Sequence, residues 1–180
     1  MKLRTRFAAC IVLAVLAVPA RSQAQGKRPG ALAPTHPDIV YGPHVRNRLD
    51  LWLAPGEKPT PLLICIHGGG FMGGDKQIYR ANRRLLKRML DAGISVASIN
   101  YRLTQGGRNP YPAPMLDGAL AVQFLRANAE KYNLAKERFA ATGGSAGGQM
   151  LLWLGFHPDL ARADDADPVR RESSRLQVLA

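Results

Sequence analysis

The sequence has 180 residues, of which 46% are apolar and 21% are charged, which is the composition of a globular protein long enough for one domain with a real core. It contains no internal repeat and no low-complexity block, which excludes repeat architectures. The net charge of +12 suggests a nucleic-acid partner, but the basic residues are scattered or lie on one helix face with few aromatic residues among them for base stacking, so we predict no nucleic-acid binding.

The first 24 residues are predicted to be a signal peptide. Lys2, Arg4 and Arg6 precede an apolar run over residues 7–20, and the small residues that follow suit cleavage after Ala24. The alternative is a membrane anchor, but the run is too short to span a bilayer of about 30 Å. We therefore expect an exported protein, periplasmic or secreted, with no stable membrane anchor after cleavage. Removal of the leader's four basic residues lowers the net charge from +12 to +8.

A lead-in and two short strands are expected next. Residues 25–37 are rich in glycine, proline and polar groups and are predicted to be an exposed lead-in, with the folded domain at 38–180. Apolar runs at 39–41 and 49–53 suit two antiparallel strands at the start of a sheet. The run at 62–66 has no polar alternation, which predicts a parallel strand covered on both faces.

A glycine loop, HGGGF at residues 67–71, follows that strand directly, and a helix is predicted after it. Apolar residues recur at helical spacing between Asp75 and Gly93. Asp75 is more consistent with a cap or loop-stabilising group than with a catalytic acid. The helix also carries basic residues that are expected to form a solvated face: Arg80, Arg83, Arg84, Lys87 and Arg88. The excess positive charge of the chain as a whole suits an acidic polymer or an anionic surface outside the cell.

Strands and helices continue to alternate along the chain. Residues 94–99 are predicted to form a strand, and Pro114 suits the first turn of the helix that follows. Asp117 lies in that first turn, where the helix dipole favours a negative charge. This alternation predicts right-handed βαβ units and a mostly parallel sheet with helices on both faces.

Residues 138–157 predict a strand, a sharp turn and a helix, with Ser145 at the tip of the turn. The sequence around it, Gly143-Gly144-Ser145-Ala146-Gly147, matches the pattern GxSxG. The turn forces the serine into a strained backbone conformation and leaves no room for neighbouring Cβ atoms, which explains the glycines. By itself this pattern could be plain turn sequence, but a second glycine loop upstream makes the pair far more specific.

These two loops resemble those of the α/β-hydrolase superfamily, in particular carboxylesterases of the hormone-sensitive-lipase-like and feruloyl-esterase-like groups, which carry HGGG before GxSAGG. The resemblance runs from about His36 to the last residue and includes LDLW at 49–52, GDK at 74–76, NYRL at 100–103 and YPAP at 111–114. It implies an α/β-hydrolase fold and ester hydrolysis through an acyl-serine intermediate.

The expected site combines both loops. Ser145 is the predicted nucleophile, and the backbone N–H groups of Gly69, Gly70 and Ala146 are the predicted oxyanion hole. The resemblance implies that His67 shapes the glycine loop. The remaining residues expected to support the two motifs are Gly68, Gly143 and Gly147.

A serine nucleophile needs a base and an orienting acid, which follow the serine in this fold. Of the histidines, His157 is the only one after Ser145, about 18 Å away by helix rise. His36 and His44 are predicted to be surface residues. Residues 176–180 suit the strand after the serine helix, so we expect an N-terminal part of a hydrolase domain, incomplete after that strand and without the acid and histidine.

Two alternative functions remain open. One is a serine peptidase of the prolyl-oligopeptidase type, which has a similar elbow, although the HGGG loop and the lack of a propeller-like repeat disfavour it. The other is a catalytically inactive truncated hydrolase.

We expect no metal, because no histidines or cysteines lie at ligand spacing, and no cofactor, because acyl transfer by serine needs none. Cys65, the one cysteine outside the leader, is expected to be a buried packing residue. The predicted partner is a small-molecule or polymer-linked ester substrate, and the sequence leaves the oligomeric state open.

Overall fold

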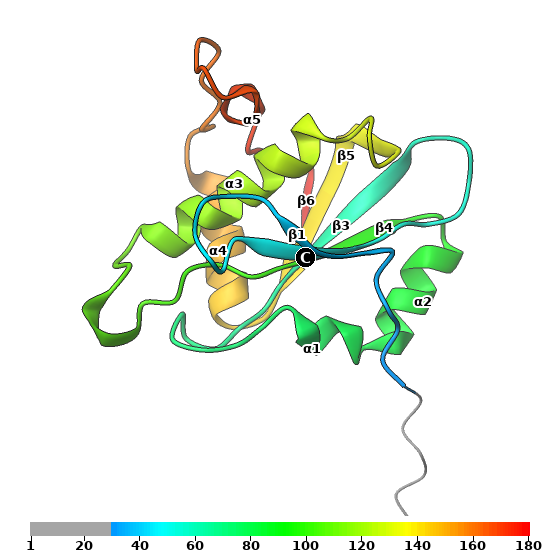
Figure 1. The fold of residues 1–180 in the computed structure, drawn as a ribbon, viewed down its shortest axis with the longest axis horizontal. Coiled ribbons are helices and arrows are strands. Elements are labelled where there is room, and N and C mark those ends of the chain that lie inside the picture. Colours follow the sequence, from blue (N-terminus) through cyan, green and yellow to red (C-terminus); the bar gives the residue numbers. More distant parts are fainter. Residues whose placement is uncertain (1–29) are drawn as a thin grey trace, which may run out of the picture.

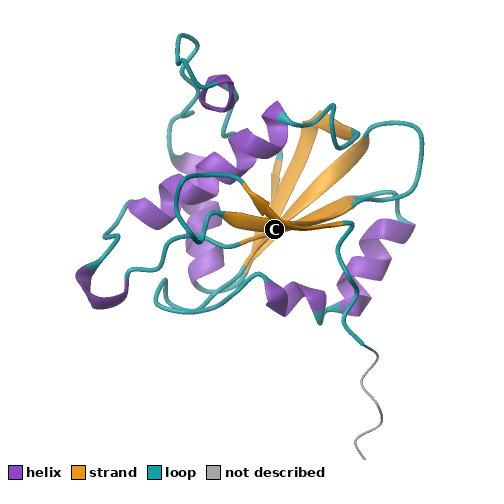
Figure 2. Ribbon diagram, viewed as in Figure 1, coloured by secondary structure: helices purple, strands orange, loops and turns teal. Residues whose placement is uncertain are grey.

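The computed structural model describes residues 30–180, which form a six-stranded sheet with helices on both faces (Figures 1 and 2). The strand order is β1-β2-β4-β3-β5-β6. The predicted signal peptide and the first part of the predicted lead-in, residues 25–29, lie outside the described residues. Within those residues, no helix combines the length and the apolar character that crossing a membrane requires.

The sheet begins with an antiparallel pair, as predicted. β1 (His36–Val40) pairs with β2 (Arg48–Trp52), which in turn pairs antiparallel with β4. Because β1 begins at His36, it includes the end of the predicted lead-in. The remaining four strands run parallel to one another: β3 (Thr60–Ile66), β4 (Ser95–Ile99), β5 (Leu134–Gly143) and β6 (Val178–Leu179).

β3 lies in the middle of the sheet, between β4 and β5, and this position explains its apolar sequence. Its residues Ile64, Cys65 and Ile66 are almost fully buried, so both faces of the strand are covered, as predicted. β5 begins earlier than the predicted start near Phe139, because Leu134 already pairs with the beginning of β3 across an irregularity in the ladder.

The helices divide between the two faces of the sheet (Figure 1). α3 and α4 cover the large core on one face, and α2 covers a smaller core on the other. α5 was not predicted from the sequence, and a short 3₁₀ turn, Gln105–Gly107, precedes α3. The helices are α1 (Gln77–Arg80), α2 (Arg83–Asp91), α3 (Ala113–Ala127), α4 (Ala146–Phe156) and α5 (Pro168–Arg171).

Cys65 packs in the smaller core with Trp52, Leu86 and Val96. Burial raises the pKa of its thiol to about 12, so the thiol stays protonated and unreactive near neutral pH. The prediction that this cysteine is a packing residue is confirmed.

The single helix predicted between Asp75 and Gly93 is wrong. The chain forms two helices, because the Asn82 side chain accepts a hydrogen bond from the Leu85 N–H and starts α2 as its N-cap. Ile78, the first of the apolar residues at helical spacing in this segment, is 64% exposed. Asp75 precedes α1 and accepts hydrogen bonds from the N–H of Gln77 and from a side chain, which confirms its predicted role in stabilising the loop.

Arg80 corrects another prediction, because it does not lie on a solvated helix face. Its guanidinium donates to both carboxylate oxygens of Asp50 on β2, at 2.6 and 2.8 Å. Lys76, only 2% exposed, pairs with Asp50 at 2.8 Å and with Asp38 on β1 at 2.7 Å. We call these four side chains the buried charge cluster. It joins the first two strands to the chain segment that follows the glycine loop.

Asp117 is also more than a charge near a helix dipole. It is buried and forms an ion pair with Arg102, with 2.6 Å between Oδ1 and Nη2. The same carboxylate accepts the N–H of Arg102 at 2.8 Å. The pair therefore fixes the chain that leaves β4 against the first turns of α3.

The buried charge cluster predicts the effect of removing one carboxylate. Asp50→Asn leaves the buried ammonium of Lys76 with only Asp38 as its partner, and breaking a buried pair is strongly destabilising. We expect the free energy of unfolding to fall by about 3 kcal/mol, measured by urea denaturation. As a control, Asp91→Asn removes an exposed i,i+4 pair with Lys87 and should leave stability unchanged within error. Equal stability of both variants would contradict a structural role for the cluster.

The same carboxylate predicts a pH dependence. Burial by itself would raise the pKa of Asp50, but the hydrogen bonds from Arg80 and Lys76 outweigh it and lower the pKa below 3.8. A lowered carboxylate pKa contributes stability above its unfolded value, and that stability is lost as the pH falls through the folded value. Below about pH 4, the wild type should therefore lose stability more steeply than Asp50→Asn. If wild type and Asp50→Asn lost stability in parallel during acid denaturation, the lowered pKa of Asp50 would not be the source of the pH dependence.

Candidate active site

The sheet register brings the two glycine loops together. Ile66, the last residue of β3, pairs with Gly143, the last residue of β5. The next residues, His67 and Gly144, therefore leave the sheet side by side at the carboxyl ends of neighbouring parallel strands. Open α/β sheets bind their ligands at this end.

Ser145 lies at the tip of the turn between β5 and α4, and its side chain is exposed. Its backbone has a φ of 55° and a ψ of −122°, a conformation that costs a non-glycine residue about 1–3 kcal/mol. The strained serine predicted from the sequence is confirmed. Such strain persists only where the surrounding structure imposes it, and it occurs most often at functional sites.

The glycines around the serine are needed for space. A Cβ on Gly147 would lie 2.3 Å from the carbonyl oxygen of Ile66, and one on Gly143 would lie 2.8 Å from the same atom. Real Cβ atoms do not approach backbone oxygens so closely. Both positions therefore require glycine, because the start of α4 lies directly against the end of β3.

The triple-glycine loop turns back on itself. Gly69 and Gly70 have φ values of 117° and 60°, in the left-handed region that favours glycine. The Gly69 carbonyl accepts the N–H groups of Met72 and Gly73, both at 3.0 Å. Gly69 and Gly70 are themselves exposed, and within residues 30–180 neither of their N–H groups has an acceptor.

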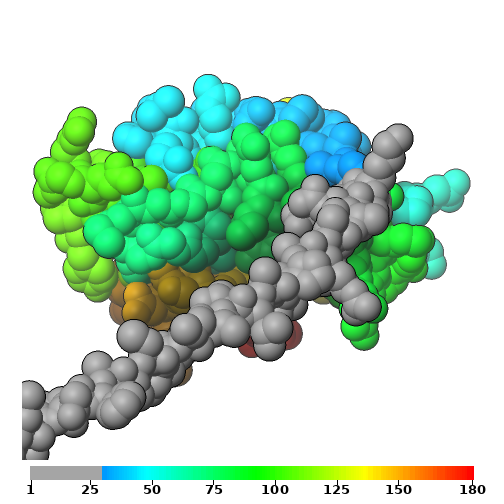
Figure 3. Space-filling model, turned by 90° about the horizontal axis from the view of Figure 1, so that it is seen from below, coloured from blue at the N-terminus to red at the C-terminus, as the bar shows by residue number. Residues whose placement is uncertain are grey.

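The loop and the serine turn are in direct contact. A Cβ built on Gly68 would lie 2.9 Å from the carbonyl oxygen of Gly144 and 3.3 Å from Cβ of Ser145. Figure 3 shows the same neighbourhood from below, where the segment that contains the glycine loop lies next to the beginning of α4. Ala146 opens α4, so its N–H has no acceptor within the helix and is free to bind a ligand at this contact.

His67 holds the base of the glycine loop. It is 2% exposed, stacks on the ring of Tyr101 at 4.3 Å between centroids, and donates from Nδ1 to the Gly68 carbonyl at 2.8 Å. Tyr101 also donates its hydroxyl to the His67 carbonyl at 2.7 Å. Burial lowers the pKa of His67, which favours the neutral ring. This geometry is that of a side chain that shapes the loop.

The far side of the loop is held by residues to which the sequence analysis assigned no role. Arg46, from the loop between β1 and β2, donates to the carbonyls of Gly74 and Tyr101, both at 2.9 Å. Asn100 accepts the N–H of Lys76 at 2.6 Å. Asn100 and Tyr101 have two sequence signals, their position directly after a buried strand and their place in the NYRL segment of the family resemblance, whereas Arg46 has no comparable signal.

The other histidines lie elsewhere. His157 follows α4 at its C-terminal end and stacks on Trp153, as expected from helix rise. His36 contacts Tyr132, just before β5, and the His44 ring nitrogen accepts the N–H of Arg46. These two and His157 are partly buried. All four histidines of the sequence lie within residues 30–180, and none forms a hydrogen bond with Ser145 there.

Metal-binding residues do not gather in the part of the chain that the structure describes: no three histidine, cysteine, aspartate or glutamate side chains lie close enough to hold an ion. The expectation of a reaction without metal or cofactor stays a prediction.

Comparison with known proteins supports an esterase relationship. The sequence is 37% identical to esterase LipQ of Mycobacterium tuberculosis over 120 residues, which are 63% of this chain and 27% of LipQ. It is 33% identical over 126 residues to the probable carboxylic ester hydrolase LipM of the same organism, covering 68% of this chain and 28% of LipM. The chain thus spans little more than a quarter of the length of these relatives.

A solved structure shows the same fold. The acetyl ester-xyloside bifunctional hydrolase of Caldicellulosiruptor lactoaceticus superposes with a TM-score of 0.70 at 25% identity, over 82% of this chain and 57% of that one. The predicted α/β-hydrolase-type sheet is confirmed. The sequence also matches the BD-FAE family model over residues 49–179. Because that match covers well over half of the sequence, this protein belongs to the BD-FAE family, a feruloyl-esterase-like group of the α/β-hydrolases.

Proposed function

We propose that this protein is an exported serine hydrolase that cleaves carboxylic esters through an acyl-serine intermediate. The observation that carries the proposal is the contact between the two loops: the exposed, strained Ser145 lies against the triple-glycine loop, and Gly68 is the glycine at the contact. Export rests on the predicted signal peptide at residues 1–24.

In this mechanism, Oγ of Ser145 attacks the carbonyl carbon of the ester, and the carbonyl oxygen takes the negative charge. The N–H groups of Gly69, Gly70 and Ala146 donate to that oxygen. When the carbonyl re-forms, the bond to the alcohol oxygen breaks, and the alcohol leaves with a proton while the acyl group stays on the serine. Attack by water then releases the acid and restores the hydroxyl.

Two features of the chain support stabilisation of the oxyanion. Ala146 is the first residue of α4, so the positive end of the helix dipole points toward the developing charge. The N–H groups of the glycine loop are also fixed before substrate binds, because His67, Tyr101 and Arg46 hold both sides of the loop. Donors that need no reorganisation contribute most to catalysis of this kind.

Removal of the serine proton is expected to be the slow part of acylation, because none of the four histidines of the chain forms a hydrogen bond with Ser145. Removal of one triad member leaves only the catalysis from the oxyanion hole and binding. We therefore expect slow acylation by activated esters. Deacylation by residues 30–180 should be slower still, because none of their histidines is hydrogen-bonded to Ser145 and placed to activate water there, so the acyl-serine should accumulate.

The proposed substrate is a small-molecule or polymer-linked ester. A structural relative is named for action on an acetyl ester and a xyloside, which favours acyl groups carried on carbohydrate. The relatives by sequence are named as esterases, so ester cleavage is preferred over the peptidase alternative. A peptide substrate and an ester with matched acyl groups would separate the two functions.

Replacing the serine tests the nucleophile. With p-nitrophenyl acetate, mass spectrometry should find one acetyl group on the wild-type peptide that contains Ser145, and none in Ser145→Ala or Ser145→Gly. Glycine relieves the backbone strain that alanine retains, so Ser145→Gly should be about 1 kcal/mol more stable than Ser145→Ala in urea denaturation. Equal acetylation and hydrolysis in wild type and Ser145→Ala would remove the proposal, and would favour the inactive-hydrolase alternative.

The contact between the loops is tested by two alanine substitutions in the same loop. Gly68→Ala places a methyl group 2.9 Å from the Gly144 carbonyl oxygen and must push the loops apart, whereas the position of a Cβ on Gly73 is open. Small displacements of reacting groups are costly, so Gly68→Ala should acylate at least about tenfold more slowly than wild type. Gly73→Ala is the matched control and should react normally. Equal rates for the two variants would show that the contact does not position the site.

A further inference from the structure

A second feature of the surface lies away from the serine: the outer face of α2 is strongly basic. Of its nine residues, four are exposed cations and only Asp91 is acidic. Two cations lie in the first turn, and the next two lie one turn further along. We call these side chains the α2 basic face: Arg83, Arg84, Lys87 and Arg88.

This arrangement is unfavourable in the free protein. Arg83 and Lys87 form a like-charged i,i+4 pair, as do Arg84 and Arg88, and such pairs destabilise a helix. Cations in the first turn also oppose the helix dipole, and no acidic residue lies there to compensate. Helices normally avoid like charges four residues apart and cations in the first turn. Where an exposed helix has both, and packing does not explain them, a functional role for the charges is a reasonable inference.

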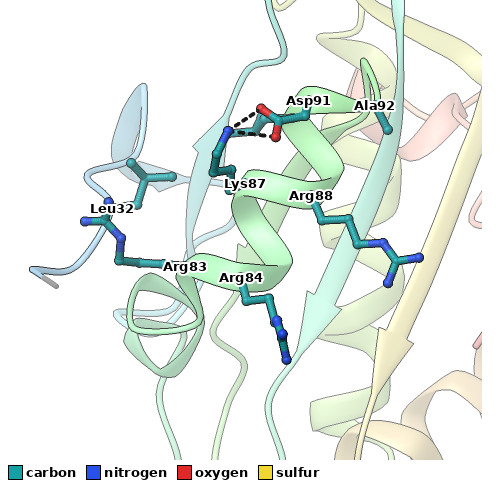
Figure 4. Close-up of a pocket in the computed structure, with 8 residues that line it drawn as sticks. Leu32, Arg83, Arg84, Lys87, Arg88, Asp91 and Ala92 are labelled. Carbon is teal, nitrogen blue, oxygen red and sulfur yellow. Dashed lines mark hydrogen bonds and ion pairs between the residues drawn. The ribbon is translucent and has the colours of Figure 1, made fainter. Parts of the chain in front are cut away.

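The protein itself relieves only part of this repulsion. Lys87 pairs with Asp91 at 2.8 Å, and Arg83 donates to the Gly30 carbonyl at 2.6 Å. The guanidinium groups of Arg84 and Arg88 have no hydrogen-bond or ion-pair partner within residues 30–180. Figure 4 shows both extending from the same side of α2, while Arg83 lies toward Leu32. Two neighbouring cations are thus left for an external anion.

The basic face borders a groove of about 890 Å³. Besides the four cations and Asp91, its lining contains Leu32, Leu90 and Ala92 (Figure 4). The two leucines are partly buried, so the groove offers a few apolar contacts between its charged edges. A groove of this kind fits an extended chain that carries regularly spaced negative charges.

We propose that the α2 basic face binds an acidic polysaccharide, a polymer whose uronic-acid units carry one carboxylate per sugar. Guanidinium groups match carboxylates by paired hydrogen bonds as well as by charge. The lining contains no aromatic ring on which a nucleic-acid base could stack. Its leucines are recessed and do not project as insertion into a membrane would require. The choice of a carbohydrate among polyanions rests on the proposed function.

The position of the groove suits a polymer-holding site. α2 covers one face of the sheet, and α4, which begins at the serine turn, covers the other (Figure 1). A bound polymer therefore leaves the exposed Ser145 free for an ester group on a neighbouring part of the same polymer. Holding the polymer raises the effective concentration of its ester groups at Ser145.

The test measures binding without catalysis. Labelled polygalacturonate is titrated with the protein at low ionic strength, and the neutral polymer arabinoxylan serves as the uncharged comparison. The double variant Arg84→Gln/Arg88→Gln should have at least about a tenfold higher Kd for polygalacturonate than wild type, because each cation near an anionic surface contributes strongly to the attraction. Arg108→Gln with Arg138→Gln is the control, since it removes the same charge from exposed positions outside the groove.

The control should bind nearly as wild type does, and added salt should abolish the difference between the two double variants. Removing like charges from α2 should leave its variant at least as stable as wild type in urea, so weaker binding would not reflect unfolding. Equal losses in both double variants, or tighter binding to anionic vesicles or duplex DNA, would overturn the proposal. Ser145→Ala should bind polygalacturonate like wild type, so a failure of polymer binding can be distinguished from a failure of the proposed serine chemistry.

Discussion

The pairing of Ile66 with Gly143 at the ends of β3 and β5 is the constraint on which the site depends. If β3 were shifted by one residue relative to β5, the glycine loop would move away from the serine turn. Each side chain of β3 would then point to the opposite face of the sheet. With this register, β3 and β5 end at the same level, and the two loops emerge in contact. The glycines at 143 and 147 then follow as a spatial necessity, because the Ile66 carbonyl oxygen occupies the space that a Cβ would need.

A second constraint acts from the opposite side of the glycine loop. The buried charge cluster holds Lys76 against two carboxylates on the first two strands, just after the loop returns to the sheet. Arg46 and Tyr101 fix the loop between these points by hydrogen bonds to backbone carbonyls. The antiparallel start of the sheet therefore supports the site, although none of its residues contacts Ser145 within residues 30–180.

The basic face of α2 follows a different logic from these buried charges. Asp50 and Asp117 are paired and satisfied, and their partners explain why they are buried. Arg84 and Arg88 are exposed, mutually repulsive and without partners in residues 30–180. Charges of the first kind hold parts of the fold together, whereas those of the second kind are exposed and accessible to an anionic partner.

By itself, the sequence determined the parts of this protein that depend on local pattern. The apolar run before HGGG, the GxSxG turn with its strained serine and the order of strands and helices all follow from the chemistry of short segments, and so did the family resemblance. Which charges pair became visible only in the folded chain: Arg80 pairs with Asp50 instead of lying on a solvated face, and Asp117 pairs with Arg102 in addition to lying near a helix dipole. The folded chain also shows that Asn82 divides a predicted helix in two. The ion pairs join residues that are distant in sequence, so no pattern within a short segment reveals them. The break at Asn82 depends on one side chain that accepts a backbone N–H, and a single residue does not alter the periodic pattern of the segment.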